Sequence, residues 1–301
     1  MLKNNKSPLV SVTMPVYNAG LFLREAINSI LNQTYKNFEL IIVDDASTDN
    51  SGEIISSFKR QYPRRIKVIK LSKNLNRGGD VAGNIGFRLA KGEFVARMDA
   101  DDIAASDRLE KQVSFLLTNP KIFAVGSNAH VIDKEGYLIG EKKMPLDNEK
   151  IYKEFFVFHP LIHPTLMFRK SATKRRNLYK LEYQANNDYL TFFEMITKGY
   201  RFANLPEKLL FYRFHGNNDS LIKVKSRFLN SLKIRIKAIG EFGYRPDFVS
   251  VVKLLAQVFI VAILPEKIIV PFYLIIRGIS KPSFARLDKE RKYAFNKAVN
   301  F

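Results

Sequence analysis

The sequence predicts an α/β fold in which helices flank a mostly parallel sheet. Short apolar runs rich in β-branched residues alternate about four times with segments of helical pattern in the first 120 residues. Polar side chains follow three of these runs directly, where the predicted strands end. Because ligands bind beyond the carboxyl ends of parallel strands, we expect the functional site at this edge of the sheet.

The first half of the chain supplies most of the predicted sheet. Its apolar runs predict strands at 9–17, 38–47, 66–71 and 93–99. The segments between them predict helices at 19–33, 51–62 and 80–92. Gly92 is expected to close the third helix, and Ser106 to cap a fourth. Beyond these, the pattern predicts strands at 123–133, 163–170 and 208–216, and a helix at 187–200 with Gly199 at its end.

Length and composition limit the classes of function. A chain of 301 residues can hold one large α/β domain with an appendage, or two modest domains. It has no cysteine, which excludes disulfides, thiolate catalysis and zinc–thiolate sites. The formal net charge of +20 indicates a polyanionic partner, such as nucleic acid, anionic lipid or a phosphorylated small molecule. The acids concentrate in the first half and the basic residues in the tail, so the two regions are expected to have different partners.

Four acids surround the end of the strand predicted at 93–99, namely Asp99, Asp101, Asp102 and, a turn later, Asp107. Like charges this close repel, and their burial is costly unless a cation or fixed donors compensate. Asp99 and Asp101 could hold Mg²⁺ or Mn²⁺ through oxygen ligands. The alternative is an acidic turn that caps the following helix. The spacing alone leaves both interpretations open.

Several blocks of the sequence resemble the family 2 glycosyltransferases, which have the GT-A fold. The blocks are VSVTMPVYNAGLFLREAINSILNQTYKNFELIIVDDASTDNS, NLNRGGDVAGNIGFRLAKGEFVARMDADD, HPTLMFRKS and KGYRFANLPEKLLFYRFHGN. They occur in order over residues 8–220, and the letters DAD at 99–101 match the family's Asp-x-Asp motif. The resemblance implies a GT-A, Rossmann-like domain over 1–220, followed by a helical region over 221–301.

The resemblance also implies roles for matching residues. At a nucleotide-sugar site it places Pro15, Tyr17 and Asn18 in the nucleotide pocket, Asp45 on the uracil ring, Arg77 near the base and diphosphate, and Asp99 on the ribose side. It implies Asp101 as a ligand of Mn²⁺ or Mg²⁺, with support from Asp102. His215 matches a position that contacts the metal or the diphosphate in some relatives, although a lone histidine after a strand is more often structural.

The implied catalytic base is Asp188, which would deprotonate the acceptor hydroxyl as it attacks the sugar C1. The family has a Glu-Asp pair here at the start of a helix. In this chain the glutamate is Asn187, and later positions of the pattern are Leu190 and Phe192. The alternative is that Asp188 only caps the helix. His163 could face the acceptor or pack in the core.

The region 221–301 combines basic and apolar segments. A basic helical pattern at 223–245 precedes an apolar run at 248–264, which Pro265 ends. As a helix, this run would rise about 25 Å, less than the hydrocarbon thickness of about 30 Å. We expect helices that lie in the membrane interface, with basic residues on anionic headgroups. The alternative is a helical bundle packed on the domain.

Together these features predict a metal-dependent, inverting glycosyltransferase that moves a sugar from a UDP-sugar to a lipid-linked glycan acceptor. Inversion, Mn²⁺ or Mg²⁺, and a role in cell-surface polysaccharide synthesis are implied by the resemblance. The expected location is the cytoplasmic face of the cell membrane, with peripheral attachment.

Three alternatives stay open. Asn187 and Leu190 would suit a relative that binds a sugar nucleotide without transferring it. A sugar nucleotidyltransferase would show a glycine-rich activating loop with a basic residue near the N-terminus, which PVYNAG does not supply. A nucleic-acid-binding protein would explain the charge, but the basic stretch has no recognisable module or stacking aromatic pattern. We therefore expect no nucleic-acid partner.

Overall fold

The computed structural model describes residues 7–75, 79–173, 175–215, 224–265 and 268–269. Its strands are β1 (Val10–Val16), β2 (Phe38–Asp44), β3 (Ile66–Lys70), β4 (Phe94–Arg97), β5 (Ile103–Ala104), β6 (Ile122–Ile132), β7 (Leu138–Lys142), β8 (Met167–Arg169) and β9 (Arg201–Arg213). Its α-helices are α1 (Leu23–Leu31), α2 (Ser51–Gln61), α3 (Asp80–Leu89), α4 (Arg108–Thr118), α5 (Asn148–Glu154), α6 (Asn187–Thr197), α7 (Val224–Gly240) and α8 (Phe248–Ile263). Two 3₁₀ turns cover His163–Thr165 and Lys170–Ala172.

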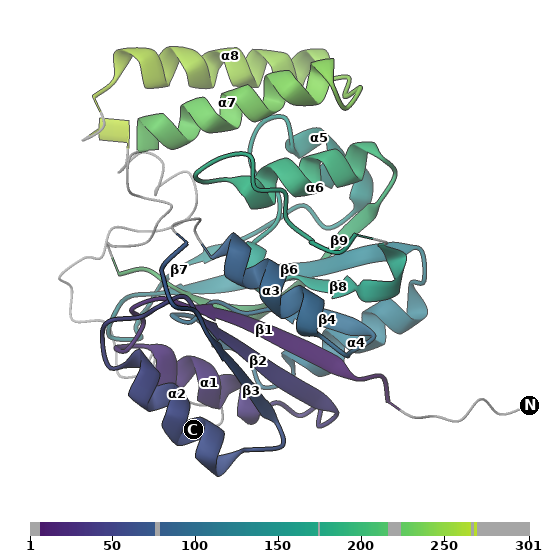
Figure 1. Cartoon of the computed structure of the whole chain (residues 1–301). Helices are drawn as coiled ribbons and strands as arrows, with labels where there is room; N and C mark the ends of the chain where they lie inside the picture. Colours follow the sequence, from purple (N-terminus) through teal and green to yellow (C-terminus); the bar gives the residue numbers. More distant parts are fainter. Residues whose placement is uncertain (1–6, 76–78, 174, 216–223, 266–267, 270–301) are drawn as a thin grey trace, which may run out of the picture.

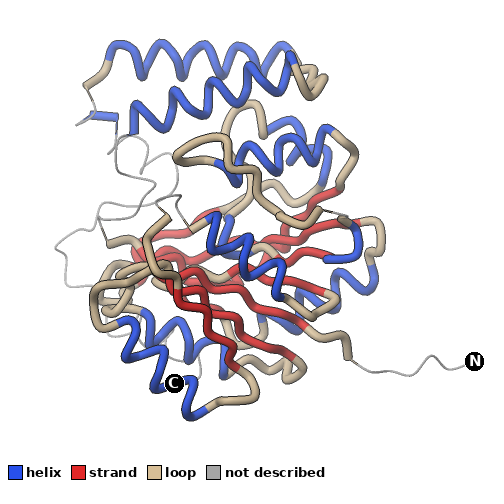
Figure 2. The backbone as a smooth tube through the Cα atoms, viewed as in Figure 1, coloured by secondary structure: helices blue, strands red, loops and turns tan. Residues whose placement is uncertain are grey.

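The strands of the described residues form one mixed sheet in the order β3-β2-β1-β4-β8-β6-β9-β5, and β7 pairs with β6 (Figure 1; Figure 2). β3, β2, β1 and β4 are mutually parallel. β8 is antiparallel to both β4 and β6, whereas β6 and β9 are parallel. The α/β fold class is confirmed. The later strands add antiparallel pairs, because β5 runs antiparallel to β9, β7 to β6, and β8 to both β4 and β6.

Alternate side chains of the parallel strands enter two different cores. Met14 of β1 and Ile42 of β2 belong to a buried cluster that includes the apolar faces of α1, α2 and α4. Ile41 and Val43 belong to a second cluster with α3, α5 and α6. Successive strand residues point to opposite faces, so both faces of these strands are covered. Figure 1 shows α1 and α2 on one side of the sheet and α3 on the other.

Three sequence-based boundaries are wrong. The third helix ends at Leu89 and not at Gly92. A Cβ on Gly92 would lie 2.6 Å from the carbonyl oxygen of Leu9, so glycine is needed there for close backbone packing. Ser106 does not cap α4, because Asp107 occupies the N-cap position. The strand expected at 163–170 is reduced to β8 by the preceding 3₁₀ turn.

The helices α7 and α8 lie over α5 and α6 (Figure 1). Ile234 and Ala238 of α7, and Leu254 of α8, are buried in the same cluster as α6. The buried Arg235 donates a hydrogen bond to the carbonyl oxygen of Val157 at 2.7 Å. This packing agrees with the helical-bundle alternative. The domain boundary expected at 220/221 lies outside the described residues and stays a prediction.

Candidate active site

The acids predicted at the end of β4 are each held by a different partner. Arg97, which is buried, donates from Nε to Asp99 Oδ1 at 2.8 Å, and its Nη2 lies 2.8 Å from the same oxygen. Asp101 Oδ2 lies 3.1 Å from Nε2 of His215, which follows β9. The two residues that the sequence predicts as metal ligands therefore meet, although 114 positions separate them.

Arg213 fixes the backbone around these acids. Its backbone N–H donates to Asp102 Oδ1 at 2.8 Å, and its Nε donates to the carbonyl oxygen of Asp101 at 2.9 Å. Asp102 is buried, and burial followed by repulsion from Asp101 and Asp99 raises its pKa well above the usual range. Its hydrogen bond from the Arg213 backbone holds the turn, whereas its predicted support of a metal site stays a prediction.

The residues around Asp101 fit a divalent cation that takes further ligands from a diphosphate or water. No group of three or more His, Cys, Asp and Glu side chains suited to a metal occurs among the described residues. The pair of Asp101 Oδ2 and His215 Nε2 nevertheless brings together one oxygen and one nitrogen ligand. Oδ2 of the neighbouring Asp102 is buried and has no hydrogen-bond partner among the described residues. The buried Asp102 carboxyl, whose pKa is raised by burial and by Asp101 and Asp99, would be favoured in its ionised form by a cation held at Asp101.

The residues expected at the nucleotide pocket surround the ends of β1 and β2. Pro15 is buried in β1, whereas Tyr17 is about half exposed. Asn18, with φ of 48°, accepts a hydrogen bond from the Thr48 backbone at 2.8 Å, so its side chain holds the loop after β2. Their assignment to a nucleotide stays a prediction.

Asp45 follows β2 and is also buried. Its Oδ1 accepts a hydrogen bond from the backbone of Leu75 at 3.1 Å. Burial and the neighbouring Asp44 raise its pKa, against the effect of that hydrogen bond. A carboxylate oxygen at this position is a suitable acceptor for an N–H group of a nucleotide base. Arg77 lies outside the described residues.

Asp188 lies in the first turn of α6, next to two histidines. His159 Nε2 and His163 Nδ1 are 3.3 Å and 3.6 Å from Asp188 Oδ2. Burial opposes ionisation of Asp188, but the histidines outweigh it and hold the pKa of this carboxyl well below its usual range. Asp188 is not the N-cap, because Asn186 occupies that position with φ of 67°. The carboxylate is thus ionised and available to accept a proton at neutral pH.

The departures from the family pattern beside Asp188 are accommodated by packing. Asn187 is fully buried and makes paired hydrogen bonds with the backbone N–H and carbonyl of Tyr183, at 2.9 and 2.8 Å. Leu190 and Phe192 are fully buried in the cluster that joins α6 to the sheet. These residues hold the helix in place, so they leave the position of Asp188 intact.

The comparison with known proteins decides the family. The family model described as Glycosyl transferase family 2 matches residues 11–176, more than half of the chain. The chain belongs to the family 2 glycosyltransferases. A glycosyltransferase of Haemophilus influenzae without an assigned activity is 35% identical over 257 residues, 78% of each chain.

Two further relatives of this family 2 glycosyltransferase carry informative names. The Escherichia coli protein WfaP, named UDP-Glc:alpha-D-GlcNAc-diphosphoundecaprenol beta-1,3-glucosyltransferase, is 27% identical over 281 residues, 93% of this chain and 98% of its own. Mannosyltransferase PcManGT from Pyrobaculum calidifontis, solved with GDP-Man and Mn²⁺, has a TM-score of 0.59 over 98% of this chain and 87% of its own, at 19% identity. The similarity to PcManGT shows that the two chains share a fold.

Four residues of this glycosyltransferase site escaped the sequence-based assignment: His159, Tyr179, Asp80 and Arg97. Asp80 is buried in α3, and burial together with repulsion from Asp188 raises its pKa well above the usual range. The repeated His-Pro dipeptide at 159–160 and 163–164 was a usable signal for the histidines. Nothing in the sequence marks Tyr179, because its loop reaches the site only through tertiary packing.

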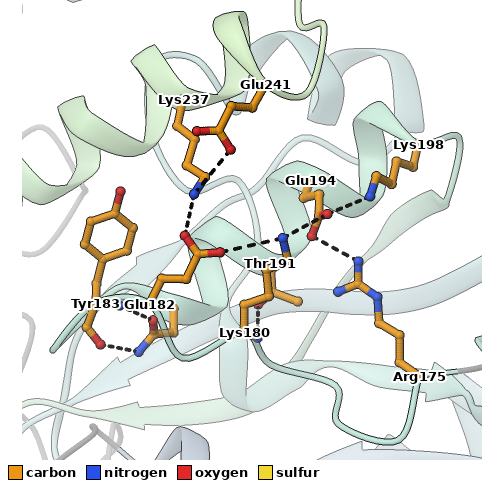
Figure 3. Close-up of polar contacts among 10 residues, drawn as sticks. Arg175, Lys180, Glu182, Tyr183, Thr191, Glu194, Lys198, Lys237 and Glu241 are labelled. Carbon is orange, nitrogen blue, oxygen red and sulfur yellow. Dashed lines mark hydrogen bonds and ion pairs between the residues drawn. The ribbon is translucent and has the colours of Figure 1, made fainter.

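An ion-pair network anchors the helix that carries Asp188 (Figure 3). Glu194 of α6 is only 3% exposed and lies within 3.0 Å of Arg175, Lys180 and Lys198 nitrogens. Burial opposes ionisation, but these three partners lower the pKa of Glu194 to about 2. Glu182 extends the network to Lys237 of α7 at 2.5 Å. The helix that carries Asp188 is therefore joined to α7.

Proposed function

We propose that this family 2 glycosyltransferase is an inverting enzyme that moves a sugar from a UDP-sugar to a hydroxyl of a lipid-linked glycan acceptor in cell-surface polysaccharide synthesis. The observation that carries the proposal is the Asp188 carboxylate, which His159 and His163 approach, in a site that also contains Asp99. Tyr179, which contacts His163, and Arg97, which pairs with Asp99, both border Gly83, where a Cβ would lie 2.9 Å from Tyr179 and 2.7 Å from Arg97. The name of WfaP, with its UDP-sugar donor and diphosphate-linked lipid acceptor, supports these substrate classes.

Asp188 acts as the general base in the proposed reaction. It takes the proton of the acceptor hydroxyl while that oxygen forms a bond to the sugar C1. The bond between C1 and the diphosphate oxygen breaks, and UDP leaves with the electron pair. Because attack and departure occur on opposite sides of C1 in one displacement, the configuration inverts. A divalent cation held by Asp101 and His215 would neutralise the charge of the leaving diphosphate.

Release of nucleotide from a panel of sugar donors tests this function without a known acceptor. We expect Mn²⁺-dependent UDP release from one UDP-sugar, and loss of that release in EDTA. GDP-mannose belongs in the panel because PcManGT was solved with it. GDP release in preference to UDP release would overturn the donor class. UDP binding without release, even with lipid-linked acceptors, would identify a binder that does not transfer.

We also propose that the enzyme attaches peripherally to the cytoplasmic face of the cell membrane through α7 and α8. No helix in the described ranges is both long and apolar enough to cross a bilayer. α8 has a buried side, which includes Leu254, and an outer side whose exposed apolar residues are Phe248, Val249, Val252, Leu255, Phe259, Ile260 and Ile263. α7 contains five Lys and Arg residues and no acid; Arg235 is buried and Lys237 pairs with Glu182, which leaves three for a surface. An apolar face beside net positive charge suits an anionic interface.

Vesicle sedimentation tests this attachment. The full chain is expected to bind vesicles containing about 30% phosphatidylglycerol, and to bind phosphatidylcholine vesicles at least about tenfold more weakly. Replacing Phe248, Leu255 and Phe259 together by serine should reduce binding at least about tenfold, because their apolar surface would no longer enter the interface. Leu21→Ser is the matched control, since Leu21 is 89% exposed but far from α8 in the chain. Equal binding by the triple variant would contradict the proposed surface.

A further inference from the structure

Two histidines converge on one oxygen of Asp188. His159 approaches Oδ2 through Nε2, and His163 approaches the same oxygen through Nδ1. Both rings also lie against Phe192, at centroid separations of 6.2 and 5.9 Å. The aromatic core thus restrains both imidazoles, and each presents a different ring nitrogen to the carboxylate.

The Asp188 carboxylate selects the tautomer of His163, because a carboxylate can only accept a hydrogen bond, whereas the Tyr179 hydroxyl can donate or accept. The other ring nitrogen of His163, Nε2, lies 2.7 Å from that hydroxyl. Burial and then Arg97 lower the pKa of His163 to about 4, so the ring is neutral at neutral pH and has one N–H. A proton on Nδ1 lets the ring face the carboxylate with an N–H, while Tyr179 donates to Nε2. The opposite tautomer would turn a lone pair toward the Asp188 carboxylate.

The same reasoning gives His159 the other tautomer. Its Nδ1 accepts a hydrogen bond from the backbone N–H of Leu161 at 3.4 Å. In the neutral ring, the proton then resides on Nε2, which is the atom 3.3 Å from Asp188 Oδ2. This Nε2 is buried and has no hydrogen-bond partner among the described residues. The Asp188 carboxylate, whose Oδ2 lies 3.3 Å away, is the acceptor that this N–H faces.

We propose that His159 and His163 are paired positioning residues, each turning one N–H toward Oδ2 of Asp188. Together they fix the rotation of the carboxylate and assign its Oδ1 to receive the acceptor proton. Tyr179 acts one step further away, because its hydroxyl can donate to Nε2, the nitrogen that this tautomer of His163 leaves unprotonated. The consequence for catalysis rests on the proposed function, whereas the tautomers do not.

The pair also sets the pH at which Asp188 is protonated. N–H groups directed at a carboxylate favour its ionised form. The other titratable or charged groups that act on Asp188 or on its histidines from neighbouring segments are Asp80, Arg97, Asp99 and Tyr179. Removing one N–H raises the pKa of Asp188, so the acid limb of activity moves to higher pH.

Nitrogen NMR of the ¹⁵N-histidine-labelled full chain tests the arrangement independently of turnover. The chain has four histidines, and single His→Asn substitutions assign their signals. At about pH 7 we expect His163 in the Nδ1–H form and His159 in the Nε2–H form. Tyr179→Phe should keep His163 in the Nδ1–H form, because the carboxylate still faces Nδ1, but should shift the signal of its unprotonated Nε2, which loses its hydrogen-bond donor; His159 should be unchanged. An Nε2–H signal from His163 in the parent chain, or an Nδ1–H signal from His159, would overturn the proposal.

Kinetics test whether the pair positions the base or only supports the fold. His159→Ala and His163→Ala should each lower kcat between about 10- and 100-fold with an unchanged KM for the donor. In both, the acid limb of the pH profile should move upward. His159→Gln and His163→Asn, which restore an N–H in place of Nε2 and Nδ1, should recover part of the loss. His130→Asn is the control, because His130 stacks on Phe211 and makes no contact with Asp188 among the described residues.

These measurements separate the two proposals. An inactive parent chain with the expected tautomers would reject the proposed function while retaining the arrangement of the histidines around Asp188. An active parent whose alanine variants keep the pH profile and kcat would reject the positioning role alone.

Discussion

Asp188→Asn is expected to lower the rate of sugar transfer by about 10²- to 10⁴-fold, the usual contribution of a positioned general base. An amide has no strongly basic oxygen, so it cannot take the acceptor proton as the C1–oxygen bond forms. Affinity for UDP should be unchanged, because Asp188 lies on α6 and the residues predicted to bind the nucleotide follow β1, β2 and β4. Transfer kinetics and calorimetric UDP binding on the same preparation measure both effects.

Asp107→Asn is the matched control for this substitution. Asp107 is partly exposed at the start of α4 and pairs with Lys111 at 2.7 Å. The Asp107→Asn substitution removes the same charge from an acid outside the candidate active site. Activity should therefore stay within about twofold of the parent value. Comparable losses in both variants would mean that the effect comes from net charge and not from a base at position 188.

Arg213→Met is expected to lower the free energy of unfolding by about 3–5 kcal/mol. Arg213 is fully buried, and its side chain donates to the carbonyl oxygens of Asp101 and Lys134 and pairs with Glu25. Methionine fills much of the volume but leaves the buried carbonyls without these donors. Urea unfolding followed by circular dichroism measures the change.

Replacement of Arg213 should also weaken binding of the proposed metal ion, because Arg213 donates to the backbone carbonyl of Asp101 and lies two residues before His215. We expect a higher Mn²⁺ concentration for half-maximal activity in Arg213→Lys, which retains charge but not the fork of donors. Arg201→Met, at the exposed start of the same strand, is the control and should change unfolding by less than about 0.5 kcal/mol. Equal stability of the Arg213→Met and Arg201→Met variants would refute the assigned role.

The parallel half of the sheet could be predicted from the sequence because its signal is local. Each of β1, β2 and β4 is buried on both faces, so its apolar run is continuous and visible without knowing its neighbours. Boundaries at Gly92 and Ser106 were wrong because they depend on distant contacts. Glycine is needed at position 92 because the backbone of Leu9, which is far away in sequence, packs closely against it.

The acids illustrate the same limit within the site. In the sequence, Asp99, Asp101, Asp102 and Asp107 form one cluster of negative charge. In the structure, Asp99 pairs with Arg97 and Asp107 with Lys111, which are local partners. Asp101 and Asp102 instead depend on the end of β9, which β-sheet pairing brings to them across more than 100 residues. The spacing of the acids in the sequence predicts that their charges lie close together. Only the pairing of the strands decides which partner each acid has.

The sequence by itself determined the α/β class, the family and the identity of Asp188 as the candidate base, because these depend on local apolar period and on motifs of adjacent residues. The tertiary structure alone decided what surrounds that base. His159, His163 and Tyr179 come from the segment before β8 and the loop before α6, and they meet Asp188 only when α6 packs on the sheet. The chemical environment of a buried carboxylate is set by neighbours in space, and neither spacing nor composition specifies them.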